Sequence, residues 1–180
     1  DSLIPLWTNY VENSFAKPLK KDIDVAFLGQ VSAYRDDRRD SIEFLMEQNI
    51  SGYIASLNRD QQVDHSKYAE ILGRAKIGIN FSYSVDKHQL KGRVFETMHA
   101  GAMLLETKNP QTEAFFQDGE HFIAYENSTD LADVVERLLG EPEARLRVIG
   151  EQARECILKA HTIVHRVRRI LEVCRSGDIK

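Results

Sequence analysis

The sequence predicts an α/β domain with a doubly wound parallel sheet of about five strands, followed by C-terminal helices. Short apolar segments alternate with helical segments five times between residues 23 and 125. These segments are continuously apolar, which is typical of strands buried on both faces of a parallel sheet. After residue 128 only helical periodicity is present. Because crossovers between parallel strands are right-handed, this order favours a Rossmann-like sheet covered on both faces.

Each predicted strand is short and rich in Val, Ile, Leu or Phe. The strands are expected at Ile23–Gly29, Gly52–Leu57, Lys76–Phe81, Ala102–Glu106 and His121–Tyr125. A period near 3.6 predicts the helices. They are expected at Ser41–Gln48, Tyr68–Ala75, Lys91–Gly101, Thr112–Gln117, from Ser128 or Thr129 to Leu139, and at Glu143–Lys159 and Ile163–Cys174.

The ends of the chain and two helix starts have their own signals. Residues 1–22 lack a sustained period and are expected to form an interdomain connector, which leaves 23–180 as one domain. Asp37 or Asp40 is expected to cap the first helix, because aspartate side chains accept bonds from free helical N–H groups. The stretch from Ser82 to Leu90 is expected to be a long loop.

Bulk composition excludes several classes of partner. The 180 residues carry a formal net charge of −4, which argues against general binding of nucleic acid or a membrane surface. The apolar runs are much shorter than a transmembrane segment. Cys156 and Cys174 have no metal-ligand spacing and are expected to be reduced thiols in a cytoplasmic protein, with a disulfide left open.

One helical segment, Lys91–Gly101, organises the candidate site. Gly92 is expected to allow a tight turn into the helix, and Gly101 to end it in a left-handed conformation. The positive end of the helix, with Lys91 and Arg93, suits an anion. Glu96 lies beside it and could accept hydrogen bonds from sugar hydroxyls. Alternatively, Glu96 only complements the helix dipole and the two cations are solvated.

Basic residues follow two of the predicted strands. One group comes after the first strand and the other after the third, namely Arg35, Arg38 and Arg39, and Lys87, His88, Lys91 and Arg93. Ligands of doubly wound sheets bind at the carboxyl ends of the strands, where strand order reverses. If the first and third strands are neighbours, the two groups face one crevice and suit a diphosphate. The alternative is that these are ordinary polar surface loops.

The order and spacing of these pieces resemble the C-terminal half of group 1 (family 4-like) glycosyltransferases. The resemblance rests on the runs Phe95–Gly101, Ala102–Glu106, Thr112-Glu113, Asp118-Gly119, His121–Tyr125 and Asp130-Leu131. It is strongest to the spore-maturation-protein branch, through Ile4-Pro5, Asp24–Gly29, Arg35–Arg39 and Lys91–Glu96. The resemblance implies one half of a GT-B fold, the half that binds a nucleoside diphosphate sugar.

The resemblance also implies roles for the basic residues. Arg93 and Lys91 would be the catalytic residues, holding the departing diphosphate together with Arg38 or Arg39 during sugar transfer with retained configuration. Glu96 would pair with the ribose hydroxyls. No metal ion and no cofactor would be needed, and the partners would be the donor and an upstream acceptor-binding domain.

Other groups are expected to contribute further contacts to the donor. Backbone N–H groups near Gly29 and Gly92 could bind phosphate oxygens. Many relatives carry a second glutamate, which contacts the donor sugar, where this sequence has His88; His88 could touch a phosphate instead. The region between Leu57 and Tyr68 is short, which leaves the base unidentified.

Two alternatives follow from these departures. The chain could be a module of the same fold that binds nucleotide sugars or a partner without catalysis, as the replacement at His88 suggests. An NAD-binding domain is disfavoured, because Gly29-Gln30-Val31-Ser32 is not the glycine-rich fingerprint of that class. Without the acceptor domain, this stretch alone is expected to be inactive.

Overall fold

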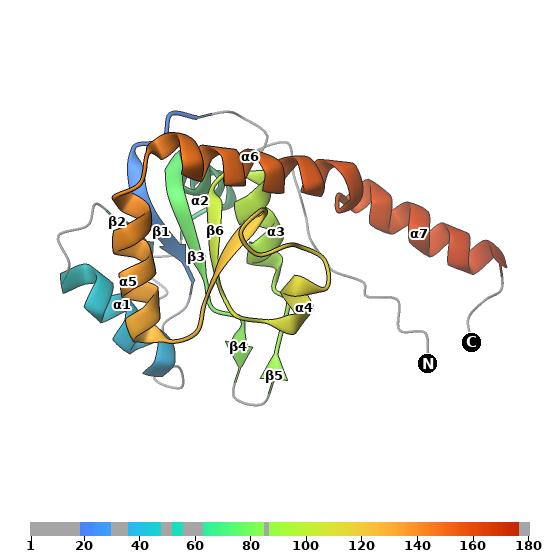
Figure 1. Ribbon diagram of the computed structural model, residues 1–180. Coiled ribbons are helices and arrows are strands. Elements are labelled where there is room, and N and C mark those ends of the chain that lie inside the picture. Colours follow the sequence, from blue (N-terminus) through green and yellow to red (C-terminus); the bar gives the residue numbers. More distant parts are fainter. Residues whose placement is uncertain (1–18, 30–35, 48–51, 56–62, 85–86, 177–180) are drawn as a thin grey trace.

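The computed structural model describes residues 19–29, 36–47, 52–55, 63–84 and 87–176 (Figure 1). Their central feature is a five-stranded, all-parallel sheet in the order β2-β1-β3-β6-β7. The strands are β1 (Ile23–Leu28), β2 (Gly52–Ala55), β3 (Ala75–Asn80), β6 (Met103–Thr107) and β7 (Phe122–Tyr125). The predicted fold class and all five strands are therefore confirmed. Strand order reverses between β1 and β3, which lie side by side.

Helices cover both faces of this sheet, as the continuous apolar strands predict. Helices α1 and α5 lie together on one face, and α2 and α3 lie on the other (Figure 1). Helix α6 packs against α3 and the sheet, and α7 extends away from it. The helices are α1 (Asp36–Glu47), α2 (His65–Arg74), α3 (Gly92–His99), α4 (Pro110–Glu113), α5 (Ser128–Leu139), α6 (Glu143–Ala160) and α7 (Ile163–Ser176).

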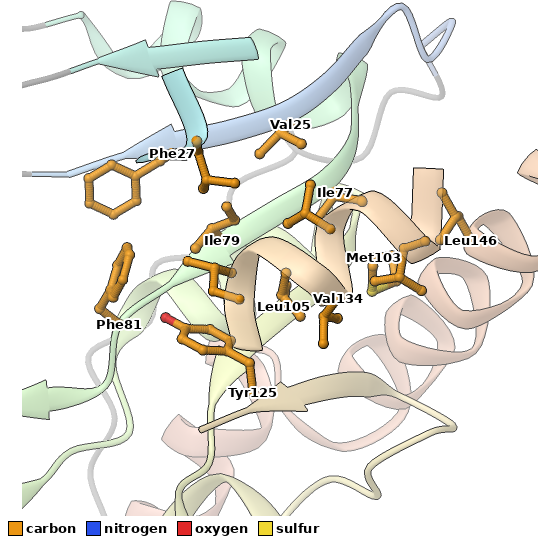
Figure 2. Close-up of a cluster of buried hydrophobic side chains, with 14 of the residues drawn as sticks. Val25, Phe27, Ile77, Ile79, Phe81, Met103, Leu105, Tyr125, Val134 and Leu146 are labelled. Atoms are coloured by element: carbon orange, nitrogen blue, oxygen red, sulfur yellow. The ribbon is translucent and has the colours of Figure 1, made fainter. Parts of the chain in front are cut away.

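Alternate residues of β1 serve the two faces, because successive side chains of a strand point in opposite directions. Val25 and Phe27 pack with Leu45 of α1 and Val135 of α5. Figure 2 shows the rings of Phe27 and Phe81 at one end of this cluster. The intervening residues of β1 pack on the opposite face with α2.

A third cluster lies around α3. Val94, Phe95 and Met98 are buried against the sheet and the second half of α6. This confirms the apolar face predicted for the Lys91–Gly101 segment. Gly101 has φ 70°, the left-handed conformation expected of a residue that ends a helix.

Several local predictions were wrong. Helix α1 begins at Asp36, so Asp37 and Asp40 lie inside it and do not cap it. Asn127, rather than Ser128 or Thr129, caps α5 by accepting from two N–H groups of the first turn. The Ser82–Leu90 loop contains a small antiparallel pair, β4 (Tyr83–Ser84) and β5 (Lys87–His88).

The predicted tight turn at Gly92 was also wrong. Gly92 is the first residue of α3, and among the described residues only Gly101 and Gly119 have positive φ. Helix α4 starts at Pro110 and ends at Glu113, earlier than expected, because Asn109 caps it and Pro110 suits the first helical position. Helix α2 likewise starts at His65 and is capped by Asp64.

Two further observations concern the whole set of described residues. Both cysteines, Cys156 and Cys174, are free thiols, as expected. None of the described helices has the length and apolar character needed to cross a membrane. Residues 1–18 of the expected connector lie outside the described part of the chain.

Candidate functional site

The candidate site lies at the carboxyl ends of β1 and β3. These neighbouring strands mark the point where strand order reverses, which is where open α/β sheets bind ligands. Polar side chains are buried at the same edge, on Asn80 at the end of β3, on Ser82 just after it, and on Glu106 of β6. Polar groups in such a position must be satisfied by one another or by a ligand.

The two groups of basic residues meet at one main-chain oxygen. Arg38 of α1 donates from Nη2 to the Phe81 carbonyl at 3.1 Å. Lys91, at the start of α3, donates from Nζ to the same carbonyl at 2.8 Å. The structure therefore brings Arg38 and Lys91 together at the end of β3, as the order of the strands predicts. The Arg38 guanidinium also lies over the Phe81 ring, 5.7 Å from its centroid.

Arg93 lies beside this pair and is held on three sides. Its Nη1 donates to the side-chain oxygen of Asn80 at 3.2 Å, and its guanidinium lies 5.4 Å from the centroid of the Phe27 ring. Gly29 allows the close approach, because a Cβ there would lie 2.7 Å from Arg93 Nη2. The Arg93 Nε is buried, and no residue that the structure describes accepts a hydrogen bond from it.

Glu96 is half-buried, one turn further along α3. It accepts a hydrogen bond from the Tyr68 hydroxyl of α2 at 2.7 Å. Burial raises the pKa of Tyr68 above its ordinary value, Glu96 raises it further, and the charge of Arg93 opposes the shift. The Tyr68 hydroxyl is thus bonded to the carboxylate and is near enough to Arg93 to feel its charge, which groups Glu96 and Arg93 in one cluster.

Glu106 is completely buried (0% exposed) beneath these cations. Its carboxylate accepts from Asn80 Nδ2 at 2.6 Å and from the Ser82 hydroxyl. Burial raises the pKa of Glu106 to about 7, while these two hydrogen bonds and the charges of Lys91 and Arg93 oppose the rise. A carboxylate at the end of a central strand thus joins the ends of β3 and β6.

Two of the other predicted site residues, Arg39 and Gly92, lie in the described part of the structure. Arg39 follows Arg38 on α1 and is partly exposed, and Gly92 begins α3. His88 belongs to β5, where it pairs with Tyr83, but its side chain lies outside the described part of the structure. Arg35 also lies outside it.

The sequence matches the family described as Glycosyl transferase-like over residues 13–172. The chain belongs to this glycosyl transferase-like family. No curated protein sequence matches it.

Solved structures show that this glycosyl transferase-like domain has the fold of the C-terminal half of GT-B enzymes. Sucrose-phosphate synthase from Thermosynechococcus elongatus superposes with a TM-score of 0.69 and 15% identity, over 93% of this chain and 49% of that one. Anabaena Alr3699/HepE, in complex with UDP and glucose, gives 0.64 and 10% identity, over 87% and 49%.

A third solved structure is a single domain, most of which superposes on this chain. The C-terminal domain of a glycosyl transferase group 1 family protein (LpcC) from Francisella tularensis gives a TM-score of 0.61 and 10% identity, over 81% of this chain and 89% of that domain. The present chain therefore spans about half the length of the two longer proteins and corresponds in extent to this single domain.

Four side chains of the glycosyl transferase-like site were missed in the sequence, namely Tyr68, Asn80, Ser82 and Glu106. Three of them could have been found from their position in the sequence, because Asn80, Ser82 and Glu106 stand at or just after the ends of predicted strands. Polar residues there line the ligand edge of a parallel sheet. Tyr68 had no such signal, because it shares the apolar side of α2 with Ile71 and Leu72.

Two histidines pack in the interior. His99 is buried, and His161 lies among aromatic rings, 5.2 Å from the centroid of Phe116. Burial lowers the pKa of each to about 4. Both therefore stay neutral near neutral pH and act as packing residues.

Proposed function

We propose that this domain binds the nucleoside diphosphate part of a sugar donor and forms the donor half of a glycosyltransferase. The observation that carries the proposal is the convergence of Arg38, Lys91 and Arg93 at the end of β3, close to Glu96. Three cations gathered at one edge of a chain with net charge −4 need a local reason. A diphosphate supplies it, because charge-assisted hydrogen bonds to phosphate are strong.

Each cation has a separate task in this proposal. Arg93 and Lys91 stabilise the departing diphosphate as its charge develops, which lowers the barrier to cleavage of the glycosidic bond. The Arg93 guanidinium supplies N–H donors to the diphosphate. Lys91 and Arg38 exchange part of their bonding to the Phe81 carbonyl for phosphate oxygens. The transfer retains configuration and uses no metal ion.

The remaining site residues hold the rest of the donor. Glu96 accepts from the ribose hydroxyls, and Tyr68 keeps its carboxylate in place until they arrive. Backbone N–H groups at Gly29, just after β1, and at Gly92 bind the phosphates; Gly92 begins α3, and a helix start offers free donors. We also assign Arg39 and His88 to contacts with the phosphates.

The relatives support the kind of donor. Anabaena Alr3699/HepE was solved with UDP-glucose, and UDP is therefore the first candidate here. Since this chain spans 49% of that protein, we propose that an acceptor-binding domain joins residues 1–22 and that the domain of residues 23–180 does not transfer sugar alone. We place the chain in the spore-maturation-protein branch of the family.

Replacing Arg93 by alanine is expected to weaken binding of a nucleoside diphosphate by tenfold to a hundredfold. A hydrogen bond to a charged group contributes roughly 1.5–3 kcal/mol, and each 1.4 kcal/mol is about tenfold in affinity. A thermal-shift screen of the wild-type chain against UDP, GDP, ADP and CMP identifies the nucleotide. Calorimetric titration with that nucleotide then gives the two dissociation constants.

Arg169→Ala is the matched control, because Arg169 is exposed on α7 and pairs only loosely with Glu172 at 3.5 Å. It removes the same charge and should leave the affinity within about twofold of wild type. If the wild type binds none of UDP, GDP and ADP, or if Arg93→Ala binds as tightly as Arg169→Ala, the proposed function is wrong.

A further inference from the structure

We propose that Glu106 is a positioning residue, which orients Asn80 and the Phe81 carbonyl so that the cations of the site face the ligand. This inference rests on the proposed nucleoside diphosphate site. It assigns a role to a side chain that itself lies under the surface, where it is fully buried. Its effect must therefore travel through its hydrogen-bond partners.

The first route runs through Asn80. A side-chain amide has a donor end and an acceptor end, and only one of them can face a guanidinium favourably. Glu106 accepts from Asn80 Nδ2 at 2.6 Å, which turns Asn80 Oδ1 toward Arg93 Nη1 at 3.2 Å. Without an acceptor at position 106, the hydrogen bond that stabilises this orientation of the amide is lost. The reversed amide would place N–H groups against Arg93.

The second route runs through the main chain after β3. Ser82 donates to the Glu106 carboxylate, and Asn80 Nδ2 also lies 3.2 Å from the Ser82 hydroxyl. Residues 80 and 82 are thus fixed on either side of Phe81, whose carbonyl holds Lys91 and Arg38. One carboxylate therefore governs the position of the acceptor that gathers two cations.

The burial of this group argues against a role in packing alone. A buried carboxyl group is unfavourable unless it is hydrogen-bonded, and more so when it is ionised, and apolar replacements of buried ionisable groups are often neutral or stabilising. The three residues of β6 that precede it, Met103, Leu104 and Leu105, are apolar and buried. A carboxylate at this position is better explained by the cations above it.

A double-mutant cycle tests the positioning role. Glu106→Met removes the acceptor at similar volume and is expected to weaken binding of the best of UDP, GDP and ADP by about tenfold. In an Arg93→Ala background the same change should weaken binding at least threefold less, because the route through Asn80 to Arg93 is gone and only the route through the Phe81 carbonyl remains. Coupling of this kind is expected only of residues that share partners. Glu106→Gln keeps an oxygen acceptor for Asn80 and should stay within threefold of wild type.

Glu151→Gln, an exposed acid on α6 that pairs with Arg147, is the control for loss of one negative charge. Asn80→Ala is the second variant, and it should reproduce the loss if Glu106→Met does not fold. The inference would be overturned if Glu106→Met weakened nucleotide binding equally in the wild-type and Arg93→Ala backgrounds. It would also be overturned if Glu106→Met or Asn80→Ala left nucleotide binding unchanged. In either case the proposed nucleotide site would still stand. If the wild type binds none of the three nucleotides, the proposed function fails and this inference falls with it.

Discussion

Replacing Phe95 by alanine is expected to lower the free energy of unfolding by about 3–5 kcal/mol. The Phe95 ring is fully buried on α3 (0% exposed), in contact with the rings of Phe116 at 5.5 Å and His161 at 5.9 Å between centroids. Alanine would leave a cavity where α3, α6 and the segment after α4 meet, and edge-on aromatic pairs would also be lost. Chemical denaturation of both proteins measures the difference.

Phe44→Ala is the matched control, since Phe44 lies on α1 and is 44% exposed. It should change the free energy of unfolding by less than about 1 kcal/mol. Equal losses for the two variants would show that Phe95 does not belong to the core. The comparison also matters for function, because α3 carries Lys91, Arg93 and Glu96 at the site and its packing fixes their positions.

Raising the pH from 4.5 to about 7 is expected to remove about 3 kcal/mol of stability through Glu106 alone. Burial raises the pKa of this carboxyl from 4.5 to about 7. In that window the unfolded chain has released the proton and the folded chain still holds it. Because the unfolded state binds fewer protons, stability falls as the pH rises, and the loss is complete above the folded pKa.

Titration of two histidines changes the stability in the opposite direction over an overlapping pH range. The lowered pKa values of His99 and His161, about 4, make stability rise with pH between about 4 and 6.5. The Glu106 contribution is therefore measured as the difference between wild type and Glu106→Gln, whose side chain stays neutral. That difference should move by about 3 kcal/mol in favour of the variant as the pH rises. A difference that is constant with pH would mean that Glu106 does not titrate in this window.

Much of the fold could be predicted because its signals are local. The strands β1, β3 and β6 are short and mostly apolar without strict alternation, and burial on both faces of a parallel sheet produces that pattern. The start of α1 could not be found in this way, because Asp36-Asp37-Arg38-Arg39-Asp40 is entirely charged and has no apolar period. The β4–β5 pair also could not be predicted, since strands of two residues are too short to show alternation of polar and apolar side chains.

Prediction of the site depended on the order of the strands in the sheet. Once β1 and β3 are neighbours, the basic residues that follow them come together, and Arg38 and Lys91 meet as expected. Their meeting point is a main-chain carbonyl, which has no signal in side-chain patterns. The pairing of Tyr68 with Glu96 joins residues 28 positions apart and depends on how α2 packs beside α3.

An NMR titration of the isotopically labelled chain with UDP, GDP and ADP in turn is the most direct test of where the nucleotide binds. The largest changes in backbone amide shifts are predicted at Gly29, Ser82, Gly92 and Arg93, around the end of β3. Changes confined to the hollow lined by Glu113, Phe115 and His121, or to α7, with those four amides unmoved, would contradict the proposed site.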